Sequence, residues 1–186
     1  MKKKGRTVLI VIIAAVVLIG ILVAGQYNSL VRADEQVNQA WSNVETQYQR
    51  RVDLIPNLVE TVNAYASHES EVYTEVAKVR ANYQEAKTPA DYQAADQSLN
   101  RMINIAVEAY PELKASENFL RLQDELAGTE NRIAVARKDY NAVATNYNRG
   151  VRAFPKNIFA GIFGFERHEL FQAAAGAEQA PTVNFK

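Results

Sequence analysis

Charged and polar residues gather around one proline in the first third of this chain: Arg50, Arg51, Asp53, Pro56 and Asn57. Two arginines beside an aspartate can form an ion pair. Because proline donates no backbone hydrogen bond and its ring crowds the preceding turn, the helical pattern around it must kink or fold back. These five residues are therefore predicted to form a charged joint with a structural or interaction role.

Residues that could bind a metal or perform catalysis are scarce. His68 and Glu69 are adjacent, but Tyr65 stands where a Glu-x-x-His motif needs glutamate, and Val72 where a zinc protease needs its second histidine. The absence of cysteine excludes thiolate metal sites, thiol nucleophiles and disulfides. No glycine-framed nucleophile and no phosphate-binding glycine loop occurs. We expect no catalytic, cofactor or metal site, and keep His68 and Glu69 as structural or interaction candidates.

Residues 8–25 are uninterrupted Val, Leu, Ile, Ala and Gly. As a helix this run spans roughly 27 Å, close to the thickness of a bilayer hydrocarbon core, and predicts a transmembrane helix in contact with lipid. A cleaved signal peptide is the alternative, although its apolar region is usually shorter. Residues 1–7 form a basic stub, which the positive-inside rule keeps in the cytoplasm. The protein is therefore expected in the cytoplasmic membrane, with the chain after residue 26 outside the cytoplasm.

The charge of the chain is unevenly distributed. It has 21 basic and 21 acidic residues, but four basic residues precede the apolar run and leave 17 against 21 beyond it. The remainder thus carries a formal charge of about −4, with both signs mixed and no basic stripe. This pattern argues against nucleic acid as a partner.

Beyond residue 26, apolar residues recur at alternating steps of three and four, which is typical of helices with one buried face. Prolines divide the pattern into helices predicted over 26–54, 57–87, 89–110 and 112–154, with the membrane helix running straight into the first. Thr88 suits a helix cap and Pro89 a first helical position. The fold class is all-α: an N-terminal transmembrane helix followed by an up-and-down antiparallel four-helix bundle over 26–154. The alternative treats Pro56 and Pro111 as kinks in one long helical hairpin.

Asp34, Arg51 and Glu69 fall on the apolar stripes. The favoured interpretation is that each side chain extends to water at the edge of the buried face. The alternative is a buried ion pair of Arg51 with Asp34 or Glu69, which would fix the register of the helices.

The segment 155–171 is rich in aromatic residues and includes Phe163 and Phe165 as interaction candidates, and 172–186 is predicted to be a flexible tail. An even number of helices returns the chain to the membrane, so this segment should lie near the bilayer surface. It can pack on the bundle or enter the headgroup region. Packing on the bundle is favoured, because Glu166 and Glu169 suit anionic lipid poorly.

Several motifs resemble the LemA family: Trp41-Ser42, residues 50–59, Tyr65-Ala-Ser-His68-Glu69, residues 109–115, residues 122–126, Thr129-Glu130, Arg137, Tyr140-Asn141, Tyr147-Asn148 and Phe154-Pro155. The resemblance covers about residues 26–171. It implies a bacterial cell-envelope protein with one membrane helix and a helical bundle, in a family not known for enzymes. The expected function is a non-enzymatic scaffold or adaptor for other envelope proteins. A ligand-sensing bundle that acts with a partner membrane protein is the alternative.

Overall fold

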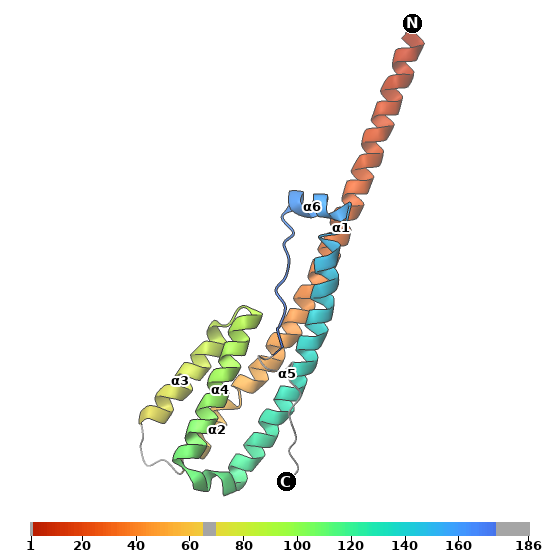
Figure 1. Ribbon diagram of the computed structural model, residues 1–186. Helices are drawn as coiled ribbons and strands as arrows, with labels where there is room; N and C mark the ends of the chain where they lie inside the picture. The colour runs from red at the N-terminus through yellow and green to blue at the C-terminus, as the bar shows by residue number, and fades with distance from the viewer. Residues whose placement is uncertain (1, 65–69, 174–186) are drawn as a thin grey trace, which may run out of the picture. The chain divides into compact units, whose positions relative to one another are not determined.

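The computed structural model describes residues 2–64 and 70–173, and every regular element in these ranges is helical, as predicted (Figure 1). The chain forms two compact units. The anchor unit comprises Met1–Ser42 with Ala142–His168, and the bundle unit comprises Asn43–Asn141 with Glu169–Lys186. The predicted flexible tail lies outside the described residues from 174 onward. The elements are α1 (Lys2–Val52), α2 (Ile55–Asn63), α3 (Ser70–Glu85), α4 (Pro89–Ala109), the 3₁₀ helix η1 (Pro111–Ala115), α5 (Glu117–Gly150) and α6 (Lys156–Phe163).

The first part of α1 exposes apolar side chains in every direction. Its large hydrophobic residues between Leu9 and Leu22 are 54% to 68% exposed, and its most apolar 18-residue window has a mean hydropathy of 2.9 with none of it buried. Water would penalise such a surface, whereas a bilayer core would solvate it. The helix is long and apolar enough to cross a membrane, and it continues to Val52 without a break, as the sequence predicted.

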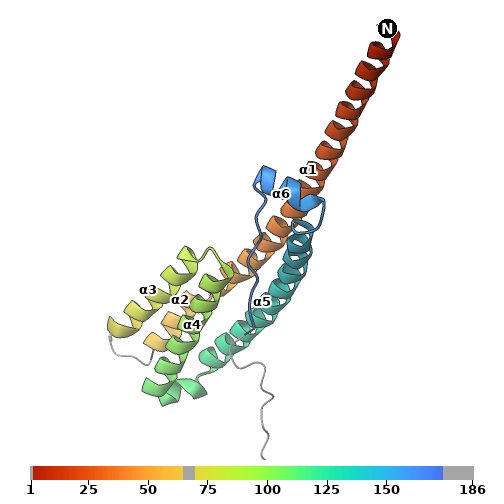
Figure 2. The ribbon, with the colours of Figure 1, turned by 45° about the horizontal axis from the view of Figure 1, so that its top comes forward.

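Within the bundle unit, the end of α1 with α2, then α3, α4 and the start of α5 run alternately down and up (Figure 2). Three residues join α3 to α4, and connections this short produce antiparallel neighbours. The arrangement is the predicted up-and-down four-helix bundle. Its core contains Val44, Tyr48, Val52, Ile55, Leu58, Val62, Val76, Val79, Tyr83, Tyr92, Leu99, Met102, Leu113, Phe119, Leu122, Ile133 and Tyr140.

The chain around Pro56 differs from the prediction, in which one helix ended at residue 54 and the next covered residues 57–87. The chain leaves α1 at Val52 and enters α2 at Ile55, with Leu54 still in the right-handed helical region. Pro56 lies in the first turn of α2, where a missing N–H breaks no helical hydrogen bond. The chain therefore continues from α1 into α2 in nearly the same direction, and α3 runs the opposite way.

The start of α4 agrees with the sequence. The Asp91 N–H donates to Thr88 Oγ1 at 3.2 Å, and the Thr88 N–H donates to Asp91 Oδ2 at 2.9 Å, which completes a reciprocal cap. The hydrogen bond from the Lys87 N–H, and then the bonds with Thr88, hold the pKa of Asp91 below its ordinary value. The last predicted helix, 112–154, is instead η1 followed by α5, which ends at Gly150.

Candidate functional site

Two arginines and two carboxylates meet inside the bundle unit. Arg51, in the last turn of α1, is 4% exposed. Its Nη1 donates to Asp96 Oδ1 at 2.5 Å, and its Nη2 donates to Glu130 Oε2. Arg137 of α5 donates through Nη2 to the other oxygen of Asp96. The four formal charges cancel, which reduces the cost of removing them from water.

Two tyrosines complete this group. Tyr83 donates its hydroxyl proton to Asp96 Oδ1 at 2.7 Å, and Tyr48 donates to Asp96 Oδ2 at 3.1 Å. Tyr48 also accepts from Arg137 Nε at 2.9 Å, and its ring stacks on Tyr92 with centroids 4.1 Å apart. Asp96 thus accepts from four donors, two on each oxygen. We call Tyr48, Arg51, Tyr83, Asp96, Glu130 and Arg137 the polar cluster.

The polar cluster stabilises particular protonation states. Burial by itself lowers the pKa of Arg51, but Asp96 and Glu130 raise it above its ordinary value, so the guanidinium stays charged. Burial and then the Asp96 carboxylate raise the pKa of Tyr48 and of Tyr83 well above their usual range. Both hydroxyls therefore remain neutral donors. The cluster joins α1, α3, α4 and α5 at one level, which makes it a structural lock.

Raising the pH above about 10 is expected to destabilise the bundle. Tyrosine in the unfolded chain loses its proton near pH 10, whereas folded Tyr48 and Tyr83 retain theirs to higher pH. The folded state then binds more protons, so stability that is complete below pH 10 is lost above it. The loss is about 1.4 kcal/mol per pH unit for each tyrosine. Urea titrations across this pH range test the slope, and an unchanged slope in Tyr83→Phe would contradict the assignment.

The five residues of the predicted joint separate in the structure. Arg51 is buried in the polar cluster, but Arg50, Asp53, Pro56 and Asn57 are exposed. Asp53 accepts a hydrogen bond from Gln49 Nε2 at 2.8 Å, and the Asn57 carbonyl accepts one from the Thr61 hydroxyl at 2.7 Å. The joint is therefore not one charged site.

The expectation that Arg51 extends to water is wrong, and so are the two partners proposed for its ion pair. Arg51 pairs with Asp96 and Glu130. Of the proposed partners, Asp34 bonds to His168. Glu69, like His68, lies outside the described residues. Burial was the correct alternative, with carboxylates from more distant parts of the chain.

Asp96, the acceptor shared by four side chains of the polar cluster, is not among the sequence-predicted residues, although its position in the sequence carries a signal. Tyr92, Leu99 and Ala106 are buried on α4, and Asp96 falls on the same three-and-four repeat. A charged residue at such a position needs a partner when its surroundings are buried. Arg137 was named in the sequence only as part of the family resemblance. Nothing in the sequence indicated that Asp96 and Arg137 would form an ion pair.

A second polar group lies in the anchor unit. Nε2 of His168 is 2.8 Å from Asp34 Oδ1 on α1, and the His168 ring packs edge-on against Tyr147 of α5 with centroids 4.9 Å apart. Burial and then Asp34 raise the pKa of Tyr147 to about 12. Asn148, which is buried, donates through Nδ2 to the His168 carbonyl at 2.8 Å and accepts from the His168 N–H at 2.9 Å. This group fixes the end of the segment that follows α6.

In the bundle unit, a second Tyr-Asn pair of α5, Tyr140 and Asn141, binds the continuation of this segment at residues 169–171. Asn141 donates to the Phe171 carbonyl at 2.9 Å and accepts from the Phe171 N–H at 3.0 Å. The Tyr140 hydroxyl donates to the Glu169 carbonyl at 2.8 Å. The asparagine of each Tyr-Asn pair of α5, together with Tyr140, therefore satisfies backbone groups of a segment that has no secondary structure of its own.

The aromatic segment packs on protein only in part. Phe163 and Phe165 place their rings 5.0 Å and 5.9 Å from that of Tyr27, and Phe171 is buried. Ile158 and Ile162 remain 51% and 69% exposed. The expected packing on protein is therefore wrong for these two residues.

The bundle unit also has an open cleft of about 530 Å³ between α2 and the start of α5. Asn57 lines it, which gives this predicted interaction residue a defined location. The lining is mostly polar and consists of Asn57, Glu60, Thr61, Ala64, Ser116, Asn118, Arg121, Leu122 and Glu125.

Comparison with known proteins agrees with these features. Residues 40–185 match the model of the LemA family. Magnetosome protein MamQ 2 of Paramagnetospirillum magneticum is 28% identical over 176 residues, which covers 79% of this chain and 65% of that protein. Protein LemA of Metamycoplasma hominis is 26% identical over 154 residues, with 81% and 70% covered. Magnetosome protein MamQ of Magnetospirillum gryphiswaldense is 26% identical over 175 residues, with 78% and 64% covered.

The match thus spans slightly less than two thirds of the length of each MamQ protein. The LemA family model covers the whole polar cluster and both Tyr-Asn pairs of α5. Together with the apolar part of α1, the match describes a membrane-associated protein. The chain belongs to the LemA family.

Proposed function

We propose that this chain is a non-enzymatic, single-pass scaffold of the cell envelope, with its bundle outside the cytoplasm. The observation that carries the proposal is α1 itself. One uninterrupted helix bears the apolar run and, in its last two turns, contributes Tyr48 and Arg51 to the polar cluster. Such a helix links a lipid anchor to a firmly packed bundle, which suits the presentation of a protein-binding surface.

The absence of catalysis is part of this proposal. Both oxygens of Asp96 already accept two hydrogen bonds each, so this largely buried carboxylate is no free base. Among the described residues, no group of three or more His, Asp or Glu side chains is placed to hold a metal ion. The proposed partners are the lipid bilayer, through residues 8–25, and other envelope proteins. Nucleic acid is not a proposed partner.

Topology is tested with single cysteines, because the natural chain has none. Lys138→Cys, on the exposed side of α5, should react with a membrane-impermeant maleimide in intact cells. Lys3→Cys, in the basic stub, should react only after the cells are permeabilised. The opposite pattern would place the bundle in the cytoplasm and overturn the proposed orientation.

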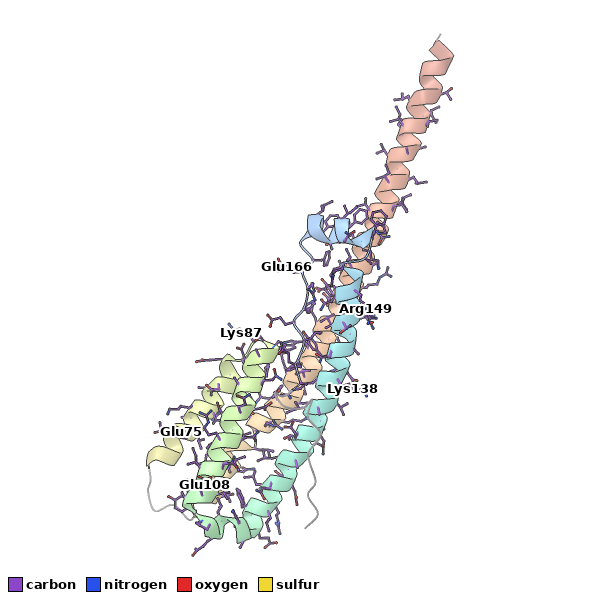
Figure 3. All side chains as sticks on the ribbon, viewed as in Figure 1. Glu75, Lys87, Glu108, Lys138, Arg149 and Glu166 are labelled. Atoms are coloured by element: carbon purple, nitrogen blue, oxygen red, sulfur yellow. The ribbon has the colours of Figure 1, made fainter. Side chains whose placement is uncertain are left out.

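The scaffold role is tested by photocrosslinking in intact cells, with the crosslinking amino acid placed at the exposed residues Lys87, Glu108 and Lys138 (Figure 3). We expect one or a few membrane proteins to be captured reproducibly from one side of the bundle. Arg51→Ala, which should loosen the bundle, serves as the control and should reduce the yield. Capture that is equal at all three sites and indifferent to Arg51 would contradict a specific scaffold.

Ligand sensing is the second candidate, and the cleft beside Asn57 is the observation that favours it. A sensor should retain a small polar molecule through purification, detectable by native mass spectrometry of the full-length protein. Asn57→Ala and Arg121→Ala, which both alter the lining, should lose it, whereas the exposed Arg132→Ala on the same helix as Arg121 should not. If nothing is retained by the unaltered protein, the sensing proposal fails.

A further inference from the structure

We propose that α6 is a second membrane contact: a short helix lying in the headgroup region of an anionic bilayer, with Ile158 and Ile162 turned into lipid. The proposal rests on the membrane anchoring proposed above and adds a site to it. All the residues that carry it belong to the anchor unit.

The two faces of α6 differ sharply. Ala160 is buried, and Lys156 and Phe159 are half-buried, so these define the face that packs on protein. Ile158 and Ile162, four residues apart, lie on the opposite face and are 51% and 69% exposed. Phe154, just before the helix, is 82% exposed. An apolar face this open on a short helix is characteristic of a segment that rests on a membrane.

Contacts with α1 place α6 where the apolar run ends. At the start of α6, Lys156 Nζ donates to Ser29 Oγ at 3.0 Å, and at its end the Phe163 ring packs against Tyr27. Tyr27 and Ser29 follow Gly25 by two and four residues, or about 3–6 Å of helix rise beyond the predicted span. A bilayer that surrounds residues 8–25 therefore has its surface at the level of α6. Tyr27 is itself a suitable residue for that interface.

The orientation of α6 also suits a membrane surface. Its eight residues extend about 12 Å, yet its two ends contact residues of α1 that are only about 3 Å apart along the axis. The helix therefore lies across α1, as both ribbon views show, and parallel to a bilayer that α1 crosses. Gly164, with φ of 74°, then ends α6 and turns the chain aside.

The charges of the neighbouring chain favour anionic lipid. Residues 142–168 contain four basic residues, Arg149, Arg152, Lys156 and Arg167, and one acidic residue, Glu166. Glu166 follows the Gly164 turn and lies on the side of α6 away from the apolar run (Figure 3). Glu166, one of the two acidic residues that argued against lipid in the sequence, is thus directed away from the proposed membrane. Basic side chains beside an inserted apolar face strengthen attachment to anionic headgroups.

The depth of α6 is measured on the full-length chain in vesicles of phosphatidylglycerol and phosphatidylethanolamine. Ile162→Cys, or Ile158→Cys as a second variant, carries a fluorophore, and quenching is compared between a lipid-attached nitroxide and aqueous iodide. Ala142→Cys, on an exposed helical position of the same unit, is the water-facing control. Val16→Cys, within the apolar run, is the lipid-facing control. Iodide quenching at Ile162 should be at least about fivefold weaker than at Ala142, with lipid quenching comparable to that at Val16.

Three other quenching patterns would each overturn the α6 proposal or the membrane anchoring on which it rests. If Ile162 and Ile158 are as accessible to iodide as Ala142 while Val16 is quenched from lipid, the anchor stands and the α6 proposal is wrong. Protection from both quenchers would mean that protein covers α6, either a second copy or another partner, and would also overturn it. If Val16 itself is not quenched from lipid, the membrane anchoring on which the proposal rests has failed.

Discussion

Asp96→Ala should lower the free energy of unfolding of the bundle by about 3–5 kcal/mol, the range typical of breaking a buried ion pair. The substitution removes the acceptor shared by Arg51, Arg137, Tyr48 and Tyr83. Two guanidinium groups would then lose a carboxylate, and only the partly exposed Glu130 would remain beside Arg51. Buried donors without an acceptor cost more than the bond itself contributed.

The measurement is urea unfolding of the full-length chain in detergent micelles, followed by far-UV circular dichroism. The apolar part of α1 should remain helical in the micelle, so the transition reports on the bundle. Asp124→Ala is the matched control, because Asp124 is an exposed aspartate on α5 of the same unit and should change stability by less than about 0.5 kcal/mol. If Asp96→Ala behaves like Asp124→Ala, the polar cluster is not a structural lock.

Arg51→Ala should cost about 3 kcal/mol by the same measurement. The guanidinium bridges Asp96 and Glu130, and its Nε also reaches Thr129 Oγ1 at 3.4 Å. The expected loss is smaller than for Asp96, since Arg137 still compensates that carboxylate. Arg50→Ala is an unusually close control: the same residue type, one position earlier, but exposed.

The two substitutions share one network, so their effects should not add. The double variant should be more stable than the sum of the single losses predicts, by about 0.5–3 kcal/mol. Strict additivity would show that Arg51 and Asp96 contribute independently. Equal effects of Arg50→Ala and Arg51→Ala would restore the interpretation in which Arg51 extends to water.

The sequence by itself determined the helical class, the apolar N-terminal helix and several boundaries, because these depend on local chemistry. The apolar run of residues 8–25 needs no distant partner to be incompatible with water. Steps of three and four residues specify which side of each helix is buried. Thr88, Pro89 and Asp91 begin α4 through bonds within four residues of one another. The motifs around Pro56 and in α5 pointed to the LemA family for the same reason, since they can be read in order along the chain.

Only the tertiary structure decided the direction of the chain after Pro56 and the ion-pair partners of Arg51. Periodicity shows that a face is buried but not whether the chain reverses after it, so the sequence left Pro56 open between a kink and a reversal. The structure places Pro56 in the first turn of the next helical segment. Arg51 was recognisable as a charge on a buried face, but its carboxylates lie 45 and 79 residues further along the chain. No local pattern encodes such a pairing. It follows from the packing of α1, α4 and α5, which brings Asp96 and Glu130 to a guanidinium that is almost entirely buried.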